Sequence, residues 1–298
     1  MKLATSTSDF FDYTNNQLDA CLYLKESGFR YLDYSFIQDY QLRNGIYQEN
    51  WRDYCNDLAN VVSAMGIKFV QGHAPMGGPI APGNDAFVED TIRCIEACDL
   101  LGIPNLVVHS GYSKGLSKAE TFAQNRDFFL KLLQVAGQYN INILVENFNK
   151  MCVEGIYWMD NATDLLAFIE YVDHPLLHAL WDAGHGNLQD MPQHEELMIL
   201  GRHVYGLHIH DNEGWEDKHQ MPYTGNLNFD SLLYGLQKIG YQGYYTFETG
   251  VILPEFRRRA FEGDSRLRKA PLSLKIEAEK LLYQIGKCTL EAYGLYEE

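Results

Sequence analysis

Short runs of strand-forming residues recur along the chain, and a longer stretch whose apolar residues have helical spacing follows most of them. Apolar residues that recur at every second position in one segment and about every 3.6 positions in the next indicate alternating strands and helices. The predicted strands cover residues 2–7, 30–36, 68–74, 105–110, 142–148, 177–183, 204–210 and 244–250.

The stretches between these runs predict amphipathic helices. The best-defined ones end on a glycine or an asparagine, which tolerate the left-handed backbone that terminates many helices. The clearest predicted helices cover residues 50–66, 85–102 and 123–140.

About eight βα units within 298 residues predict an α/β protein with a single (β/α)8 TIM barrel. A doubly wound open sheet would usually have fewer strands and a glycine-rich nucleotide loop after the first one. No such loop follows residues 2–7, and no linker or low-complexity tract divides the chain. We therefore expect one domain over residues 1–298.

Charge and hydropathy limit the classes of partner that the protein could bind. With 40 acidic and 24 basic residues the formal net charge is −16, which repels polyanions, so nucleic acid is disfavoured. No segment approaches the roughly 20 apolar residues of a membrane span, and the first residues have no signal-peptide core. The six cysteines form no disulfide framework, and we expect reduced packing residues. These features predict a cytoplasmic protein without a membrane partner.

Ionisable side chains end six successive predicted strands. In a barrel these strand ends meet at one mouth, and such groups are costly to bury unless they are paired or bound to a metal. Each alone fits a structural role, but together they predict a functional cluster. The residues are His73, His109, Glu146, Asp182, His208 and Glu248.

Imidazole and carboxylate donors suit Zn²⁺, Mn²⁺, Co²⁺ or Fe²⁺, with Mg²⁺ a further possibility, and the absence of cysteine argues against a structural zinc site. Four of the residues, Glu146, Asp182, His208 and Glu248, come from successive strands. They could hold one divalent ion from several sides and leave positions open for a substrate.

Six motifs in chain order carry a family resemblance: "GHAP" (72–75), "VVHSG" (107–111), "VENFN" (145–149), "WDAGHGN" (181–187), "GLHIHDN" (206–212) and "FETG" (247–250). Over nearly the whole chain this set resembles the xylose isomerase-like barrel superfamily, which includes sugar isomerases, sugar epimerases and AP endonucleases of the endonuclease IV type. For the isomerase and epimerase branch, the resemblance implies one metal at the four residues named above and a substrate contact by His185.

For the endonuclease branch, the resemblance implies a three-zinc cluster. The additional ligands would be His73, His109, His185, Asp217 and His219. The loop over residues 75–84 carries no basic residue and that over 211–220 is mostly acidic, whereas a DNA-binding mouth needs basic side chains. Charge therefore favours the sugar branch, with these five residues contacting the substrate or holding additional metal.

Isomerisation and epimerisation next to a carbonyl both begin with removal of a carbon-bound proton. Glu146 and Glu248 are the candidate bases, because their strands could place them on two faces of the substrate, and His185 could hydrogen-bond a substrate oxygen. We expect a divalent-metal-dependent isomerase or epimerase that acts on a sugar, sugar phosphate or keto-sugar. A zinc-dependent AP endonuclease-like phosphodiesterase and a keto-sugar or keto-inositol lyase or dehydratase stay open, as does homo-oligomerisation.

Residues in the predicted loops give further indications of the substrate class. Aromatic residues of "GIYWMDN" (155–161), together with Trp215, could stack on a sugar or merely pack as a lid. The three arginines at 257–259 could bind phosphate or form a solvated helix face. The superfamily's epimerases of free ketoses carry an arginine shortly after the seventh-strand histidine, and "HIHDNEGW" (208–215) has none.

Overall fold

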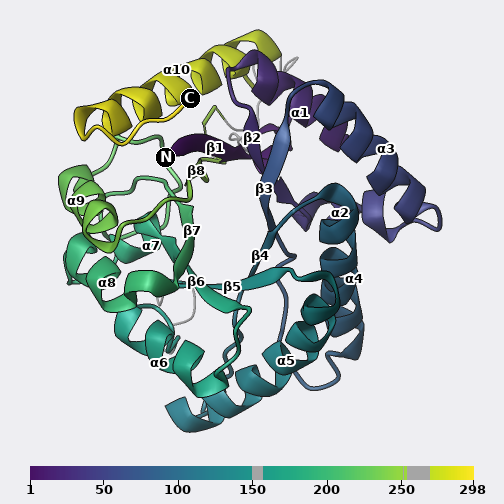
Figure 1. The fold of residues 1–298 in the computed structure, drawn as a ribbon, viewed down its shortest axis with the longest axis vertical. Coiled ribbons are helices and arrows are strands. Elements are labelled where there is room, and N and C mark those ends of the chain that lie inside the picture. Colours follow the sequence, from purple (N-terminus) through teal and green to yellow (C-terminus); the bar gives the residue numbers. More distant parts are fainter. Residues whose placement is uncertain (150–156, 251, 254–268) are drawn as a thin grey trace, which may run out of the picture.

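Eight parallel strands lie side by side in chain order and form a ring that helices surround (Figure 1). The computed structural model describes residues 1–149, 157–250, 252–253 and 269–298. The sheet order is β7-β6-β5-β4-β3-β2-β1-β8. The strands are β1 (Lys2–Ser6), β2 (Tyr31–Ser35), β3 (Lys68–His73), β4 (Asn105–Val108), β5 (Asn142–Glu146), β6 (Leu177–Asp182), β7 (Val204–His208) and β8 (Tyr244–Phe247).

A short backbone bridge between β7 and β8 nearly closes the ring. The amide of Ile209 donates to the carbonyl of Thr246 at 2.9 Å, and the amide of Glu248 donates to the carbonyl of Ile209 at 3.1 Å. This architecture confirms the predicted (β/α)8 TIM barrel. The bridge also fixes the ends of β7 and β8 next to each other, which matters for the site.

The helices follow the strands, as the sequence pattern predicts. The predicted helices at residues 50–66, 85–102 and 123–140 are observed as α3, α4 and α5, and the last two end on left-handed Gly102 and Asn140. In the described ranges no helix combines the length and apolar character that crossing a membrane requires. The α-helices are α1 (Gln17–Glu26), α2 (Ile37–Leu42), α3 (Trp51–Ala64), α4 (Asp85–Leu101), α5 (Lys118–Tyr139), α6 (Ala162–Val172), α7 (Ala183–Gly186), α8 (Gln193–Leu200), α9 (Phe229–Ile239) and α10 (Leu272–Ala292), and the 3₁₀ helices are η1 (Thr7–Phe10), η2 (Gly45–Tyr47) and η4 (Gly201–His203).

The apolar core has two parts of unequal size. The larger part fills the layer between strands and helices, whereas Val107, Leu144 and Leu180 form a small separate cluster. Successive strand side chains alternate between the two faces, so Leu144 and Glu146 lie on the same face of β5. The candidate site residues therefore lie above a small apolar layer inside the barrel.

Four cysteines, Cys21, Cys55, Cys94 and Cys98, are buried free thiols, as expected for packing residues. Cys288 is a free thiol on the exposed surface of α10, so the expected packing role is wrong for it. The sixth, Cys152, lies outside the described residues.

Packing inside the barrel predicts how adding one methyl group, by a Gly→Ala substitution, changes the free energy of unfolding. A Cβ at Gly206 would lie 2.7 Å from Leu144 Cδ1 and 3.2 Å from Leu180 Cδ1, so Gly206→Ala should lower the free energy of unfolding by about 1–3 kcal/mol. At Gly137, on the exposed side of α5, a Cβ would meet no atom of the described residues within 4 Å. Gly137→Ala should therefore stabilise by about 0.5–1 kcal/mol. Urea unfolding of both variants checks this, and equal stabilities would contradict the packing described.

Candidate metal centre

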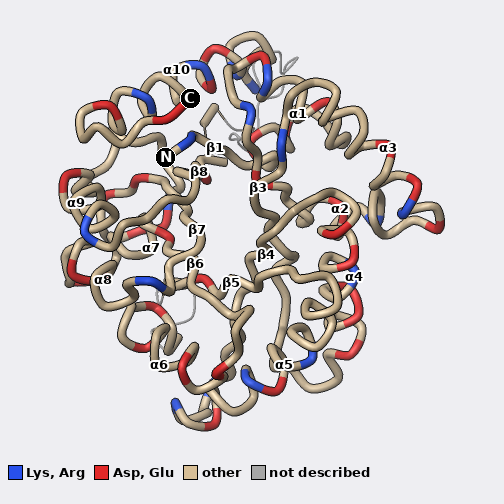
Figure 2. Tube along the Cα trace, in the orientation of Figure 1, with Lys and Arg blue, Asp and Glu red and all other residues tan. Residues whose placement is uncertain are grey.

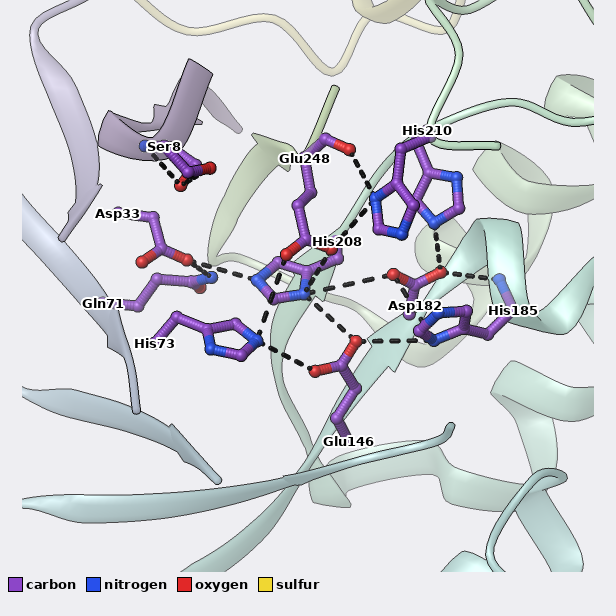
Figure 3. Close-up of polar contacts among 12 residues, drawn as sticks. Ser8, Asp33, Gln71, His73, Glu146, Asp182, His185, His208, His210 and Glu248 are labelled. Atoms are coloured by element: carbon purple, nitrogen blue, oxygen red, sulfur yellow. Dashed lines mark hydrogen bonds and ion pairs between the residues drawn. The ribbon is translucent and has the colours of Figure 1, made fainter. Parts of the chain in front are cut away.

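The ends of β5, β6, β7 and β8 bring four of the expected residues together around one imidazole (Figure 3). His208 Nδ1 lies 3.3 Å from Glu146 Oε1, 3.3 Å from Glu248 Oε2 and 4.0 Å from Asp182 Oδ2. One ligand atom from each of the four lies within 4.8 Å of all the others. Adjacent strands thus deliver three carboxylates and one imidazole to a single point.

The opposite nitrogen of His208 faces a carboxylate inside the barrel. Asp33 Oδ2 lies 3.2 Å from His208 Nε2 and accepts a hydrogen bond from Gln71 Nε2 at 2.6 Å. Asp33 and Gln71, on β2 and β3, were not among the expected site residues. The signal that could have found Asp33 is a carboxylate in the middle of an otherwise buried strand.

His73 and His109 lie at the second oxygen of Glu146, on the side of β3 and β4. Their Nε2 atoms are 3.5 Å and 3.3 Å from Glu146 Oε2 and 3.2 Å from each other. With His208, the first of them forms a second group of three possible ligands around Glu146. The sequence-predicted residues from β3 to β8 therefore do share one mouth.

Further along the mouth, three imidazoles surround Asp217. His185 Nε2 lies 3.2 Å from Asp217 Oδ2, while the Nε2 atoms of His219 and His210 lie 3.3 Å and 3.8 Å from Oδ1. The rings of His210 and His219 stack with centroids 3.9 Å apart. These four residues form a separate possible cation site. His210 was not expected, although the alternation His208-x-His210 places both on one side of an extended chain.

Backbone carbonyl oxygens determine which ring nitrogen carries a proton in two of these imidazoles. His185 Nδ1 lies 2.8 Å from the carbonyl oxygen of Asn147, and His219 Nδ1 lies 3.0 Å from that of Glu248. A carbonyl oxygen can only accept, so each Nδ1 carries a proton. If either ring were neutral, the lone pair on its Nε2 would face an oxygen of the Asp217 carboxylate. Two acceptors repel each other at this distance, so a proton or a metal ion must lie between Nε2 and the carboxylate.

The sequence "WDAGHGN" forms the one-turn helix α7 at the end of β6. Asp182 Oδ1 accepts a hydrogen bond from the His185 amide at 2.7 Å, so the carboxylate caps the turn that positions His185. A Cβ at Gly184 would overlap the ring of His210, which lies against this turn with Nε2 3.1 Å from Asp182 Oδ1. The glycine is therefore required for His210 to reach Asp182.

Burial and neighbouring charges shift the pKa values of the side chains that line the metal-free mouth. Burial alone would raise the pKa of the Glu146 carboxyl, but His109 and His208 outweigh it and hold the pKa well below its usual range. Burial alone would lower the pKa of His208, but Glu248 and Glu146 raise it well above its usual value. Burial lowers the pKa of His109 to about 4, against the attraction of Glu146.

The donor set fits a divalent cation. Glu146 Oε2, Asp182 Oδ2 and Asp217 Oδ1 are buried with imidazole nitrogens 3.3 Å, 3.6 Å and 3.3 Å away, but none of them accepts a well-aligned hydrogen bond from a described residue. Buried carboxylate oxygens are rarely left in this state unless a cation occupies the space before them. The atoms offered are nitrogen and oxygen without sulfur, which suits catalytic Zn²⁺, Mn²⁺, Co²⁺ or Fe²⁺.

The predicted aromatic residues take different positions. Tyr157 is buried, and its hydroxyl bonds to that of Ser110, whereas Trp215 is 60% exposed with Lys218 Nζ 4.4 Å from its ring centroid. Tyr157 packs against Phe148, whose ring meets His109 edge-on at 4.9 Å. Phe148, which was not expected, thus stands between the predicted tyrosine and the imidazoles. The arginines at 257–259 lie outside the described residues.

Comparisons with known proteins agree with this architecture. Residues 21–263 match the family model described as xylose isomerase-like TIM barrel. The uncharacterized protein MJ1311 of Methanocaldococcus jannaschii is 31% identical over 188 residues, which are 59% of this chain and 62% of that protein. Fructoselysine 3-epimerase of Escherichia coli O157:H7 is 32% identical over 88 residues, 30% of this chain and 32% of that enzyme. The matched segments cover less than two thirds of these curated relatives.

Solved structures share the fold over more of the chain. D-psicose 3-epimerase with D-tagatose from Clostridium cellulolyticum H10 has a TM-score of 0.74 at 15% identity, covering 97% of this chain and 99% of that one. An AP endonuclease of family 2 from Brucella melitensis has a TM-score of 0.68 at 17% identity, covering 83% and 92%. At these identities the likeness concerns the fold.

The shifted pKa of His219 predicts how pH changes the stability of the metal-free protein. Burial opposes protonation of His219, but Asp217 and Glu248 raise its pKa to about 9. A pKa raised above the unfolded value of about 6.5 adds stability that is present below that pH and lost as pH rises to the folded pKa. The free energy of unfolding contributed by His219 should therefore fall between about pH 6.5 and 9.

Thermal unfolding of chelator-treated protein across this range measures the effect, and His219→Gln should flatten the curve. Added Zn²⁺ should reverse the trend, because metal binding needs deprotonated imidazoles and competes with protons. A His219→Gln curve as steep as that of the parent would contradict the assignment.

Proposed function

Because the chain belongs to the xylose isomerase-like TIM barrel family, we propose that it is a divalent-metal-dependent enzyme that isomerises or epimerises a carbohydrate. The observation that carries this proposal is the convergence of three carboxylates on Nδ1 of His208 at the mouth of the barrel. The sequence similarity to fructoselysine 3-epimerase and the shared fold of D-psicose 3-epimerase support it. The substrate class is a sugar, a sugar phosphate or a keto-sugar.

Glu146, Asp182, His208 and Glu248 would hold the metal. A bound divalent ion supplies Lewis acidity, which polarises substrate oxygens and acidifies the adjacent carbon-bound proton. The protein's own contribution is to hold these donors in a defined arrangement at or next to the strand ends.

Glu146 and Glu248 would transfer the protons. Figure 3 shows them approaching His208 from opposite sides, so a substrate between them would present one face to each. Glu146 is 1% exposed, whereas the Glu248 side chain is 18% exposed and more accessible from the mouth. An epimerase needs an acid–base group on each face, and an aldose–ketose isomerase can work with one.

The remaining expected residues would serve as substrate contacts or as additional ligands. In the described arrangement both ring nitrogens of His185 already face acceptors, the carbonyl of Asn147 and the carboxylate of Asp217. His185 would therefore contact a substrate oxygen only after Nε2 leaves Asp217. His73, His109 and His219 line the same mouth, and we assign them the same two alternatives.

One observation favours a second candidate function. The five residues that the resemblance implies as additional zinc ligands all line this mouth, which fits an AP endonuclease-like phosphodiesterase; they are His185, Asp217 and His219 in one group and His73 and His109 beside Glu146. Against it, Figure 2 shows the lysines and arginines of the described elements interspersed with acidic residues along the trace. The net charge of −16 also opposes a polyanionic substrate. A lyase or dehydratase acting on a keto-sugar or keto-inositol uses the same proton abstraction and stays an alternative.

Removing a ligand should remove the metal. Glu146→Ala or Asp182→Ala should abolish bound metal and activity while the barrel stays folded, because the ligands lie above the packed interior. Elemental analysis and circular dichroism of both variants test this. Unchanged metal content in both would end the assignment of the centre.

The number of ions separates the two candidate functions. We predict one tightly bound divalent ion per chain in the sugar enzyme, measured by elemental analysis after dialysis. Three zinc ions per chain together with cleavage of an abasic-site duplex would move the assignment to the phosphodiesterase.

Replacing Glu248 should separate catalysis from metal binding. Glu248→Gln keeps an oxygen donor, so much of the metal affinity should remain, but turnover should fall about 10²-fold or more because a positioned base is lost. Solvent deuterium incorporation from D₂O into a panel of sugars, keto-sugars and their phosphates is the assay. If Glu248→Gln and Glu146→Gln both kept metal and near-normal exchange, these carboxylates would not be the bases, and His185 would be examined next.

A further inference from the structure

Below the candidate metal centre, β2 and β3 place two buried polar side chains, Asp33 and Gln71, inside the barrel. We propose that Asp33 is a positioning residue that holds the proton of His208 on Nε2 and so presents Nδ1 as the metal-binding nitrogen, with Gln71 fixing the carboxylate. The inference rests on the proposed metal site, and it assigns a role to side chains outside the ligand set.

The hydrogen bonds impose this direction. The Gln71 amide nitrogen can only donate, so Asp33 Oδ2 accepts from it at 2.6 Å. The same oxygen lies 3.2 Å from His208 Nε2, and because a carboxylate oxygen accepts, we place the proton of this contact on Nε2. In a neutral imidazole the lone pair is then on Nδ1, the atom that faces Glu146 and Glu248.

Packing does not explain these polar residues. Asp33, Gln71 and His208 are all buried, and Asp33 Oδ1 has no hydrogen-bond partner in the described structure. An apolar pair would spare this desolvation cost, as Val107 and Leu144 do in the same interior. A buried carboxylate that orients an imidazole is, however, a common partner of metal-binding histidines.

Strand β7, which is not adjacent to β2 or β3 in the sheet, leaves room for this arrangement. Gly206 lies two residues before His208 on β7, and a Cβ there would come within 3.2 Å of Gln71 Oε1. A side chain at position 206 would crowd Gln71, so the glycine leaves space for the Gln71–Asp33 contact. Three strands thus contribute to the orientation of one imidazole.

The experiment compares Asp33→Asn with the parent. The asparagine amide has the same shape but can turn its NH₂ group toward Nε2, which favours a proton on Nδ1 and blocks the metal-binding nitrogen. Ser35→Ala is the matched control, since it removes, from the end of the same strand, a buried hydroxyl that has no hydrogen-bond partner among the described residues. Affinity for Co²⁺ alone is measured by chelator competition, and the cobalt absorption spectrum reports the ligand geometry.

We expect Asp33→Asn to bind Co²⁺ about 10–100-fold more weakly with a changed spectrum, and Ser35→Ala to bind as the parent does. Long-range ¹H–¹⁵N NMR of the zinc-loaded parent should find zinc on Nδ1 and the proton on Nε2 of His208. This measurement decides the question even if Asp33→Asn does not fold. A proton on Nδ1, equal Co²⁺ affinity in Asp33→Asn, or an equal loss in Ser35→Ala would overturn the inference.

These outcomes are distinct from failure of the proposed function. If the parent chain bound no Co²⁺ or Zn²⁺ at all, the metal-dependent function itself would fail. If the parent bound metal and exchanged substrate protons while Asp33→Asn bound equally well, only the role of Asp33 would be wrong.

Discussion

Repulsion among buried carboxylates at one barrel mouth is the constraint on which the site depends. Glu146, Asp182 and Glu248 all approach Nδ1 of His208 within 4.0 Å, and Asp217 lies farther along the same mouth. Like charges in a poorly hydrated interior are destabilising unless protons or cations stand between them. The surrounding imidazoles provide part of this compensation, and a divalent ion would provide the rest. The large apolar layer between strands and helices supplies the stability that lets the barrel hold such a cluster.

Strand order turns this constraint into a defined geometry. Residues that are far apart in the chain end neighbouring strands, and the bridge from Ile209 to Thr246 sets His208 beside Glu248. The same closure presents the opposite side of the His208 ring to Asp33 on β2. The face of the imidazole that would bind the metal and the face that contacts Asp33 are thus fixed by different parts of the barrel.

The sequence predicted much of this arrangement because barrels obey simple rules. All eight expected strand runs contain observed strands, and Glu146, Asp182 and His208 are final strand residues. Asp33 could not be found by the same rule, because it lies in the middle of β2, where a register shift against β3 begins. Its contact with His208 joins residues 175 positions apart. The role of His210 likewise depends on the space that Gly184 leaves, which no spacing rule reveals.

The central claim is that the carboxylates and His208 are arranged for one divalent cation. Anomalous diffraction from a crystal grown with Zn²⁺ or Mn²⁺ tests it most directly. We predict a peak about 2.0–2.3 Å from Nδ1 of His208 and from oxygens of Glu146, Asp182 and Glu248. A crystal from metal-saturated solution with no peak among these four residues, or with the ion on Nε2 of His208, would contradict the account.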